Sequence, residues 1–335
     1  MKTHFLPKTT FILIIISCFF FVKTSGQNSD AEKIIGADIS FLPQLEDQGM
    51  KFNLDKKQEN AIGILREEGF NWIRLRIFVN PAADSGYSPK KGYCDLANTE
   101  KMALRIKAEN MKFLLDFHYS DFWADPGKQF KPAAWKNLPF PDLVKALHDY
   151  TKSVMLALKA QGTAPDMVQI GNEITHGILW PDGNFTHPDS LAALLKAGIE
   201  AVKEVSPSTK IMLHIADGGQ NAESKLILNT LISRGVQFDV IGESYYPFWH
   251  GTLDSLKRNL TDLSLRYKQD VVVAEYTQHK REVNDIAFNL PHGNMKGTFI
   301  WEPLNTGEPI FDKNGNAIDS LINIYPAIAN KYGVK

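Results

Sequence analysis

The clearest regularity along the chain is a series of short apolar runs rich in β-branched residues. Within each run, hydrophobic residues occupy consecutive positions instead of alternate ones, which is typical of parallel strands buried on both faces. Eight such runs occur: Ile34–Ile39, Trp72–Phe78, Lys112–His118, Met167–Glu173, Lys210–Ile215, Phe238–Tyr245, Val271–Tyr276 and Gly297–Trp301. They predict a parallel sheet of eight strands.

Between these runs, hydrophobic residues recur at helical spacing. The first helical segment, Gln58–Glu68, ends at Gly69, a typical helix stop. The others are Thr99–Glu109, Leu143–Lys159, Ser190–Val205, Ala222–Ser233 and Leu253–Tyr267. Strands alternating with helices over about 270 residues predict an α/β fold, a single (β/α)8 TIM barrel. A doubly wound sheet is the alternative, but it often carries a G-x-G-x-x-G turn after the first strand, and the sequence has none.

The first 26 residues have the pattern of a secretory signal peptide. Lys2 and Lys8 give a positively charged start, Phe11–Val22 is an apolar run, and Thr24–Gly26 offers small residues for cleavage. The apolar run is too short for a membrane-spanning helix, which needs about 20 residues. We therefore predict a signal peptide at 1–26, one barrel domain at 27–335, and export to the periplasm, the cell surface or the medium.

Charge and cysteine content narrow the partners and the compartment. The 335 residues include 37 basic and 38 acidic side chains, and removal of the signal peptide would leave a net charge of −4. Nucleic acid is therefore not the expected partner, because binding phosphates needs a basic surface. Cys94 would be the one cysteine left, so no internal disulfide can form, which fits a bacterial periplasm or cell surface. Cys18 also lies in a segment resembling a lipoprotein cleavage site, an alternative that would anchor the chain.

Ionisable and amide side chains stand at nearly every predicted strand end, where the active site of a TIM barrel forms. They include Arg74, Arg76, Asp116, His118, Asn172, Glu173, His214, Asp217, Glu243, Glu275 and Glu302. Glu173 and Glu275 end the fourth and seventh strands, which lie roughly opposite one another in such a barrel. Two facing carboxylates are what glycoside hydrolysis requires. No H-E-x-x-H or G-x-S-x-G motif favours a metalloprotease or a serine hydrolase.

The tryptophans support a sugar substrate. Five of the six lie at or just after predicted strand ends, where their rings could stack on sugar faces: Trp123, Trp135, Trp180, Trp249 and Trp301. The sixth, Trp72, opens a strand and is expected in the core.

Longer motifs resemble glycoside hydrolase family 53, the endo-β-1,4-galactanases, over roughly residues 34–332. The matching stretches include Gly36–Ser40, Asn71–Arg76, Asp116–Gln129, Gln169–Thr175, Ser244–Gly251, Val272–Glu275 and Trp301–Pro303. The segments HYSDFWADP and SYYPFWHG are the most specific of them. The resemblance implies a retaining hydrolase of β-1,4-galactan on a (β/α)8 barrel.

The resemblance also implies roles for individual residues. Glu173 would be the general acid/base and Glu275 the nucleophile. Asn172 would bind the sugar 2-hydroxyl, Arg76, with Arg74 as a possible second partner, would keep Glu275 ionised, and Tyr245 would donate a hydrogen bond to Glu275. The remaining candidate substrate-binding residues are His118, Trp301, Trp123, Asp125 and Trp249.

Some positions depart from the family pattern. Glu243 replaces an apolar residue, and the short Tyr276–Gly297 connection leaves little room for the calcium-binding loop of some relatives. Asp312–Gly315 is interpreted as a polar turn, and we expect a monomer without metal or cofactor. Two other functions stay open: another endo-glycanase such as a mannanase or xylanase, and a non-catalytic surface glycan-binding protein.

Overall fold

The structure is a computed structural model that describes residues 1–2, 32–290 and 293–335. The expected signal peptide lies almost wholly outside these residues, and so does Cys18. No helix in the described part combines the length and the apolar character needed to cross a membrane.

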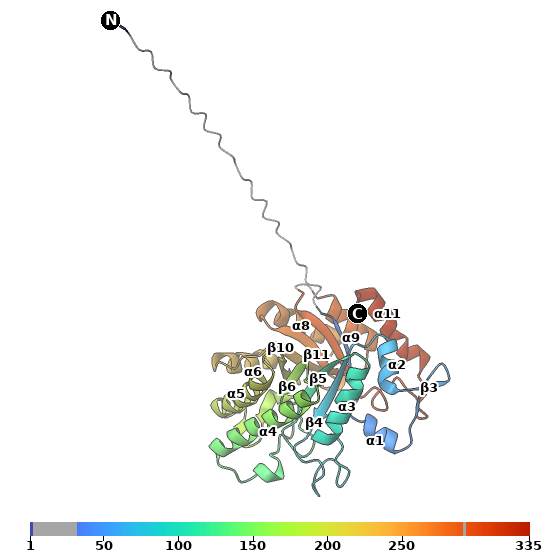
Figure 1. Cartoon of the computed structure of the whole chain (residues 1–335), viewed down its shortest axis with the longest axis horizontal. Helices are drawn as coiled ribbons and strands as arrows, with labels where there is room; N and C mark the ends of the chain where they lie inside the picture. Colours follow the sequence, from blue (N-terminus) through green and yellow to red (C-terminus); the bar gives the residue numbers. More distant parts are fainter. Residues whose placement is uncertain (3–31, 291–292) are drawn as a thin grey trace. The chain divides into compact units, whose positions relative to one another are not determined.

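Eight parallel strands close into a barrel (Figure 1). Their order around the barrel is β1-β12-β11-β10-β9-β6-β5-β4, and β1 pairs with both β12 and β4. The strands are β1 (Ile34–Asp38), β4 (Trp72–Ile77), β5 (Lys112–Phe117), β6 (Met167–Ile170), β9 (Lys210–Ile215), β10 (Val240–Tyr245), β11 (Asp270–Tyr276) and β12 (Met295–Trp301). Each overlaps one of the eight apolar runs, so the TIM-barrel prediction is confirmed.

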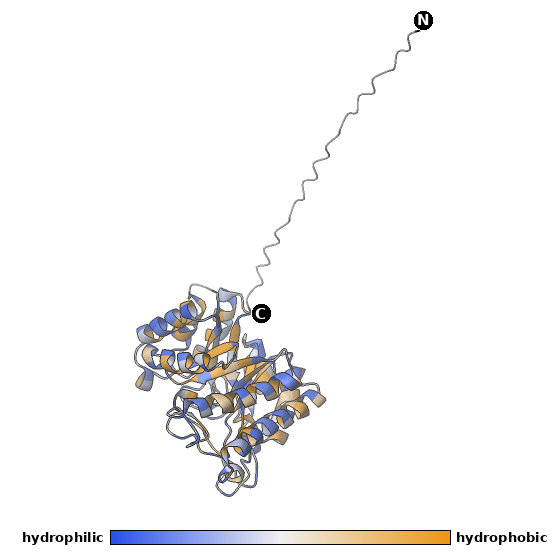
Figure 2. Cartoon of the chain, turned by 90° about the vertical axis from the view of Figure 1, so that its left-hand side faces the viewer, coloured by the Kyte–Doolittle hydropathy of each residue, from blue (hydrophilic) through white to orange (hydrophobic). Residues whose placement is uncertain are grey.

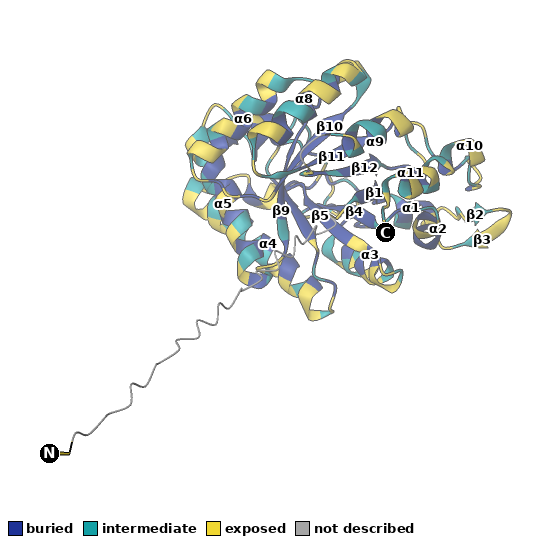
Figure 3. Cartoon of the chain, turned by 90° about the horizontal axis from the view of Figure 1, so that it is seen from above, coloured by how far each residue is buried: buried dark blue, intermediate teal, exposed yellow. Residues whose placement is uncertain are grey.

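Helices surround the barrel, with apolar faces inward and polar faces outward (Figures 2 and 3). The longer ones are α2 (Ala61–Glu67), α3 (Leu96–Ala108), α4 (Phe140–Ala160), α5 (Pro188–Val205), α6 (Asn221–Ser233), α8 (Leu253–Arg266), α9 (Lys280–Phe288) and α11 (Ile324–Tyr332). Short helical segments are α1 (Leu42–Asp47), α7 (Pro247–His250), α10 (Asp319–Ile322), η1 (Ala133–Trp135) and η2 (Ile174–His176).

The start of the first predicted helix was wrong. Lys57–Glu59 forms strand β3, which pairs with β2 (Phe52–Leu54), and α2 begins only after Asn60, whose side chain accepts a hydrogen bond from Ile62 N–H. A second small hairpin joins β7 (Gly177–Ile178) to β8 (Gly183–Asn184). Helices α9 and α11 were not among the segments expected from the sequence.

Two hydrophobic clusters hold the fold together. The larger fills the space between strands and helices. The smaller contains one or two residues from each barrel strand: Ile34, Trp72, Leu114, Met167, Met212, Val240, Val272, Ala274 and Phe299. Trp72 therefore lies in the core, as predicted. Gly36 makes room for this packing, because a Cβ there would lie 2.1 Å from the Phe299 ring. This smaller cluster fills the interior of the barrel, and the polar site lies beyond it at the carboxyl ends of the strands.

Candidate active site

Ser244 and Tyr246 link the two glutamates singled out in the sequence. The Ser244 hydroxyl donates to Glu173 Oε1 at 2.7 Å, and the backbone of Ser244 pairs in register with Glu275 of the neighbouring strand. Tyr246 donates to Glu275 Oε2 at 2.9 Å. The barrel thus brings together two carboxyl groups that lie about a hundred residues apart in the chain.

The backbone at Glu173 is strained. This residue follows β6 and adopts left-handed dihedrals, φ 49° and ψ 55°. Such a conformation costs of order 1–3 kcal/mol in a residue other than glycine, and strained residues of this kind cluster at functional sites. The strain therefore adds to the reasons for placing Glu173 in the active site.

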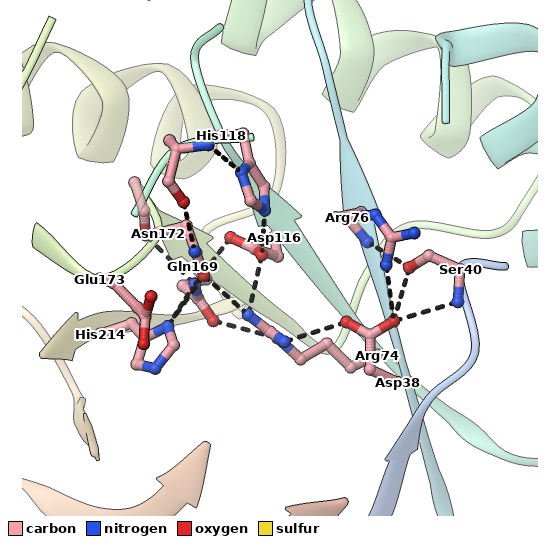
Figure 4. A network of polar contacts seen from close by, with 12 residues as sticks. Asp38, Ser40, Arg74, Arg76, Asp116, His118, Gln169, Asn172, Glu173 and His214 are labelled. Carbon is pink, nitrogen blue, oxygen red and sulfur yellow. Dashed lines mark hydrogen bonds and ion pairs between the residues drawn. The ribbon is translucent and has the colours of Figure 1, made fainter. Parts of the chain in front are cut away.

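Arg74 is the cation at the centre of the polar network (Figure 4). Its guanidinium lies 2.7 Å from Glu275 Oε1, 2.9 Å from Asp38 Oδ2 and 2.8 Å from Asp116 Oδ2. The arginine is 1% exposed, so these charges interact with little screening by water. Arg74 is therefore the residue that compensates the charge of Glu275.

The expectation that Arg76 would be the main partner of Glu275 was wrong. Arg76 lies two residues further along β4, and its guanidinium contacts Glu302 Oε1 at 2.5 Å. The guanidinium carbon also lies 4.4 Å from the centre of the Phe41 ring and 4.3 Å from that of Trp123. Arg76 thus packs against the aromatic rings that form one wall of the site and helps to hold them in place.

The two glutamates have different electrostatic surroundings. Burial raises the pKa of Glu173 well above its usual value, and the negative charge of Glu275 raises it further. Burial also raises the pKa of Glu275, but the adjacent Arg74 opposes that rise, as does the hydrogen bond from Tyr246. Glu173 is consequently the group that keeps its proton, and Glu275 the group that ionises first.

A second chain of hydrogen bonds runs from Ser244, the donor to Glu173, to His214 and on to Gln169 and Asn172. His214 Nε2 lies 2.8 Å from the Ser244 hydroxyl, and its Nδ1 lies 2.9 Å from Gln169 Nε2 and 3.0 Å from Asn172 Oδ1. Burial, followed by the charge of Arg74, lowers the pKa of His214 well below its usual value, so this imidazole is neutral. Because it is neutral, the His214 ring adds no positive charge that would lower the pKa of Glu173.

Asn172 and His118 are both buried in this network. Asn172 Oδ1 accepts from Arg74 at 3.0 Å, and its amide donates to the carbonyl of Ala124 at 2.8 Å. The amide group retains a second hydrogen that can donate to a ligand. His118 is held by Asp116, 3.1 Å from its Nε2, and by the Ala124 N–H, which donates to its Nδ1.

The predicted contact between Tyr245 and Glu275 was wrong by one residue. Tyr245 is buried and donates instead to the carbonyl of Gly251 at 3.1 Å. Side chains alternate between the two faces of a strand, so Ser244 and Tyr246 share the face opposite to that of Tyr245. A register shift between Glu243 and Ser244 interrupts the pairing with β11 just before this segment.

A cleft of about 580 Å³ opens beside Glu173. Its lining includes Asp125, Asp217, Tyr246 and Trp249, and Trp249 is 69% exposed. The volume lies within the range of small-molecule sites.

The predicted aromatic residues divide between the site and the core. Trp123 and Trp301 pack edge to face with ring centres 6.1 Å apart, and both are partly exposed. Trp180 is also partly exposed. Trp135 does not belong to the active face: it is 7% exposed and packs on Tyr150 of α4 in the core. Its place just after a strand end was misleading because the long β5–α4 loop folds back onto the helix.

The chain resembles known proteins in both sequence and structure. Residues 34–300 match the family described as Glycosyl hydrolase family 53. The chain belongs to this family. An uncharacterized protein of Niallia circulans is 43% identical over 89% of this chain and 95% of its own length. An endo-beta-1,4-galactanase of Bacillus subtilis is 37% identical over 76% of this chain, which spans 58% of that relative's length.

Solved structures agree with this assignment. The family 53 catalytic domain of Ignisphaera aggregans superposes with a TM-score of 0.83 at 33% identity, covering 89% of this chain and 96% of that one. A structure from a study of two fungal beta-1,4-galactanases gives a TM-score of 0.80 at 27% identity, covering 88% and 99%. The chain is thus a glycoside hydrolase with the complete barrel of its family.

This family 53 chain also contains site residues that sequence reasoning missed. Gln169 is fully buried and connects Asp116, Arg74 and His214, and both Gln169 and Ser244 were noted only as parts of motifs. Gln169 lies within the buried apolar strand β6, and a polar residue in such a strand is a signal that could have found it.

The turn that begins at Asp312 is stabilised by the side chain of Asp312 itself. The Asp312 carboxylate accepts hydrogen bonds from the backbone N–H groups of Asn314 and Asn316, at 2.8 and 2.9 Å. These bonds are those of a polar Asx-type turn. Among the described residues, no group of three or more His, Cys, Asp or Glu side chains is placed to hold a metal.

Proposed function

We propose that the chain is a retaining endo-β-1,4-galactanase in which Glu173 is the general acid/base and Glu275 the nucleophile. The observation that carries this assignment is the unequal surroundings of the two carboxyl groups. Burial raises the pKa of both carboxyl groups, but Arg74, 2.7 Å from Glu275, opposes the rise there, whereas the charge of Glu275 raises the pKa of Glu173 further. A double displacement needs this difference, with one carboxylate ready to attack and one carboxylic acid ready to donate.

The reaction then has two steps. In the first, Glu173 donates its proton to the glycosidic oxygen while Glu275 attacks the anomeric carbon, giving a covalent galactosyl ester and releasing the leaving chain. In the second, ionised Glu173 takes a proton from water, which attacks the ester and frees Glu275.

Neighbouring residues assist at stated atoms. The free amide hydrogen of Asn172 donates to the sugar 2-hydroxyl. Tyr246 and Arg74 hold Glu275 in position through contacts of 2.9 and 2.7 Å. His118, Trp123 and Trp301 form the wall where the sugar being cleaved lies, and Asp125 and Trp249 contact sugars further along the cleft.

The substrate proposal rests on family membership and on relatives named as galactanases. Structural neighbours such as xylanase 10B of Thermotoga maritima, at 15% identity, share the fold alone. Reducing-sugar release from linear galactan, mannan and xylan tests the proposal, and we expect release from galactan. No release from galactan, with release from mannan or xylan, would contradict it.

Product analysis tests the mechanism. Proton NMR of freshly released products should show the β-anomer first, because two inversions restore the configuration. Glu275→Ala should remove turnover. Unchanged binding and turnover in this variant would reject the catalytic assignment and favour a glycan-binding role.

We also propose that the protein is exported through residues 1–26 and acts as a monomer. The positively charged start and the apolar run Phe11–Val22 support export. N-terminal sequencing of the mature protein should find Gln27 first, whereas a lipidated Cys18 would support the alternative. Size-exclusion chromatography tests the monomer.

A further inference from the structure

A second hollow lies on the same end of the barrel, outside the catalytic cleft. Its volume is about 570 Å³, close to that of the cleft, and the two share no lining residue. Its aromatic lining is Phe122, Phe130 and Trp180, and its polar lining includes Ser85, Asn137 and Lys136. These residues come from the segments that follow β4, β5 and β6 at their carboxyl ends.

Exposed aromatic rings mark this hollow. Among the described residues, the exposed Phe and Trp side chains are Phe122, Phe130, Phe248 and Trp249, at 42%, 62%, 84% and 69% exposure. Phe122 and Phe130 lie in the segment after β5, and Phe248 and Trp249 lie in the short helix α7 directly after β10. Trp249 lines the catalytic cleft, whereas Phe122 and Phe130 line the hollow, together with the partly exposed Trp180.

The walls of the hollow are fixed before any ligand binds. The Asp121 carboxylate accepts from Asn80 N–H at 2.9 Å and from Ala133 N–H at 2.8 Å. The Lys131 ammonium lies 2.5 Å from Asp182, and Trp180 Nε1–H donates to the carbonyl of His176 at 2.9 Å. A preformed site avoids the entropy cost of ordering its walls during binding.

The hollow is also connected to the catalytic centre. The backbone N–H of Trp180 donates to the carbonyl of Gln129 at 2.6 Å. The side chain of Gln129 in turn donates to the carbonyl of Asn172 at 2.8 Å, directly before Glu173. One loop, from β5 to α4, therefore supplies a wall of both the cleft and the hollow.

We propose that this hollow is a second binding site for a chain of the same neutral polysaccharide that the cleft cleaves, a proposal that rests on the proposed function. Aromatic faces pack against the apolar faces of sugar rings. Hydroxyl, amide and ammonium groups of Ser85, Asn137 and Lys136 at the rim can bind sugar hydroxyls. Holding the polymer at a second point raises its effective concentration at the cleft without changing the chemical step.

The test compares Phe122→Ala/Phe130→Ala with wild type on two substrates. The KM for polymeric galactan should rise about threefold to tenfold, the loss expected for one or two stacking contacts, with kcat unchanged. Hydrolysis of galactotetraose should change less than that of the polymer, because a short chain held in the cleft alone loses no contact when the hollow is altered. Leu226→Ala on α6, which removes a side chain of 58% exposure, is the matched control and should change neither substrate.

Binding provides a readout that does not depend on turnover. Native electrophoresis through a gel containing galactan should retard Glu275→Gln more than the same variant carrying the two Phe→Ala changes. Equal retardation, or equal losses on polymer and tetrasaccharide, would overturn the second site. Failure of wild type to cleave galactan would instead count against the proposed function. The comparison of retardation in the galactan gel would still show whether the hollow binds the polysaccharide.

Discussion

Each of the two catalytic glutamates accepts a hydrogen bond from one hydroxyl group within residues 244–246. Ser244 donates to Glu173, and Tyr246 to Glu275, while Tyr245 between them faces away. A donor to a carboxylate favours its ionised form and lowers its pKa. The Ser244 hydroxyl therefore affects the basic limb of the pH profile of kcat/KM, which depends on Glu173. The Tyr246 hydroxyl affects the acidic limb, which depends on Glu275.

Ser244→Ala should move the basic limb of kcat/KM to higher pH. The hydrogen bond from Ser244 lowers the pKa of Glu173, so its loss raises that pKa further. Glu173 must be protonated to act as the acid, and activity would then persist to higher pH. A basic limb that moves to lower pH would show that Ser244 accepts a hydrogen bond from the protonated acid.

Tyr246→Phe should move the acidic limb of kcat/KM to higher pH. The phenol hydrogen bond lowers the pKa of Glu275, and without it the nucleophile ionises only at higher pH. Tyr245→Phe is the matched control, because that hydroxyl donates to a backbone carbonyl. A shift in the control as large as in Tyr246→Phe would contradict the assignment.

Arg74→Lys should be more harmful to catalysis than Arg76→Lys. Arg74 contacts Glu275 and two buried aspartates, and a lysine cannot reproduce this fork of hydrogen bonds. We expect about a hundredfold loss of kcat and a loss of about 3 kcal/mol in unfolding free energy for Arg74→Lys. Arg76→Lys should lower stability but leave the acidic limb in place, as pH profiles and urea unfolding can check.

At the scale of elements, the strands form the barrel because their apolar runs can be buried on both faces. The runs predicted all eight strands, since burial on both faces leaves a strong signal in a short segment. The first helix was predicted too early, because Lys57–Glu59 pairs with β2 across a two-residue turn. The turn that joins the two strands, Asp55-Lys56, lacks the glycine that marks most two-residue hairpins.

Gly36→Ala should destabilise the barrel by about 2 kcal/mol, the cost of overpacking a filled core. The added Cβ would lie 2.1 Å from the Phe299 ring, which would have to shift inside the barrel. Gly63→Ala is the control: it lies in α2, and its Cβ would come no closer than 3.4 Å to Glu109. Urea unfolding should show a loss for the first variant and no loss for the second.

At the scale of the whole molecule, stability depends on pH through carboxyl groups buried in the fold. Glu243 is fully buried on β10. Burial, followed by the charge of Asp217, raises its pKa well above 4.5. The folded protein thus binds more protons than the unfolded chain between pH 4.5 and the raised pKa, and it loses stability as the pH rises through this range.

Glu243→Gln should remove this dependence. The stability of the variant relative to wild type should grow between pH 5 and pH 8, because the amide does not ionise. Urea unfolding at both pH values measures the difference, with Glu223→Gln on the exposed face of α6 as the control. An equal change with pH in wild type and Glu243→Gln would show that Glu243 does not titrate on unfolding.

The sequence by itself determined the barrel and the two glutamates, because apolar runs and the residues that end them are local properties. Only the tertiary structure decided which arginine meets Glu275, which tyrosine donates to it, and that Trp135 is buried. Those contacts depend on how deep each side chain lies, on the register shift at Ser244 and on the path of the β5–α4 loop. All three are set when the barrel closes, and none is encoded within a single segment.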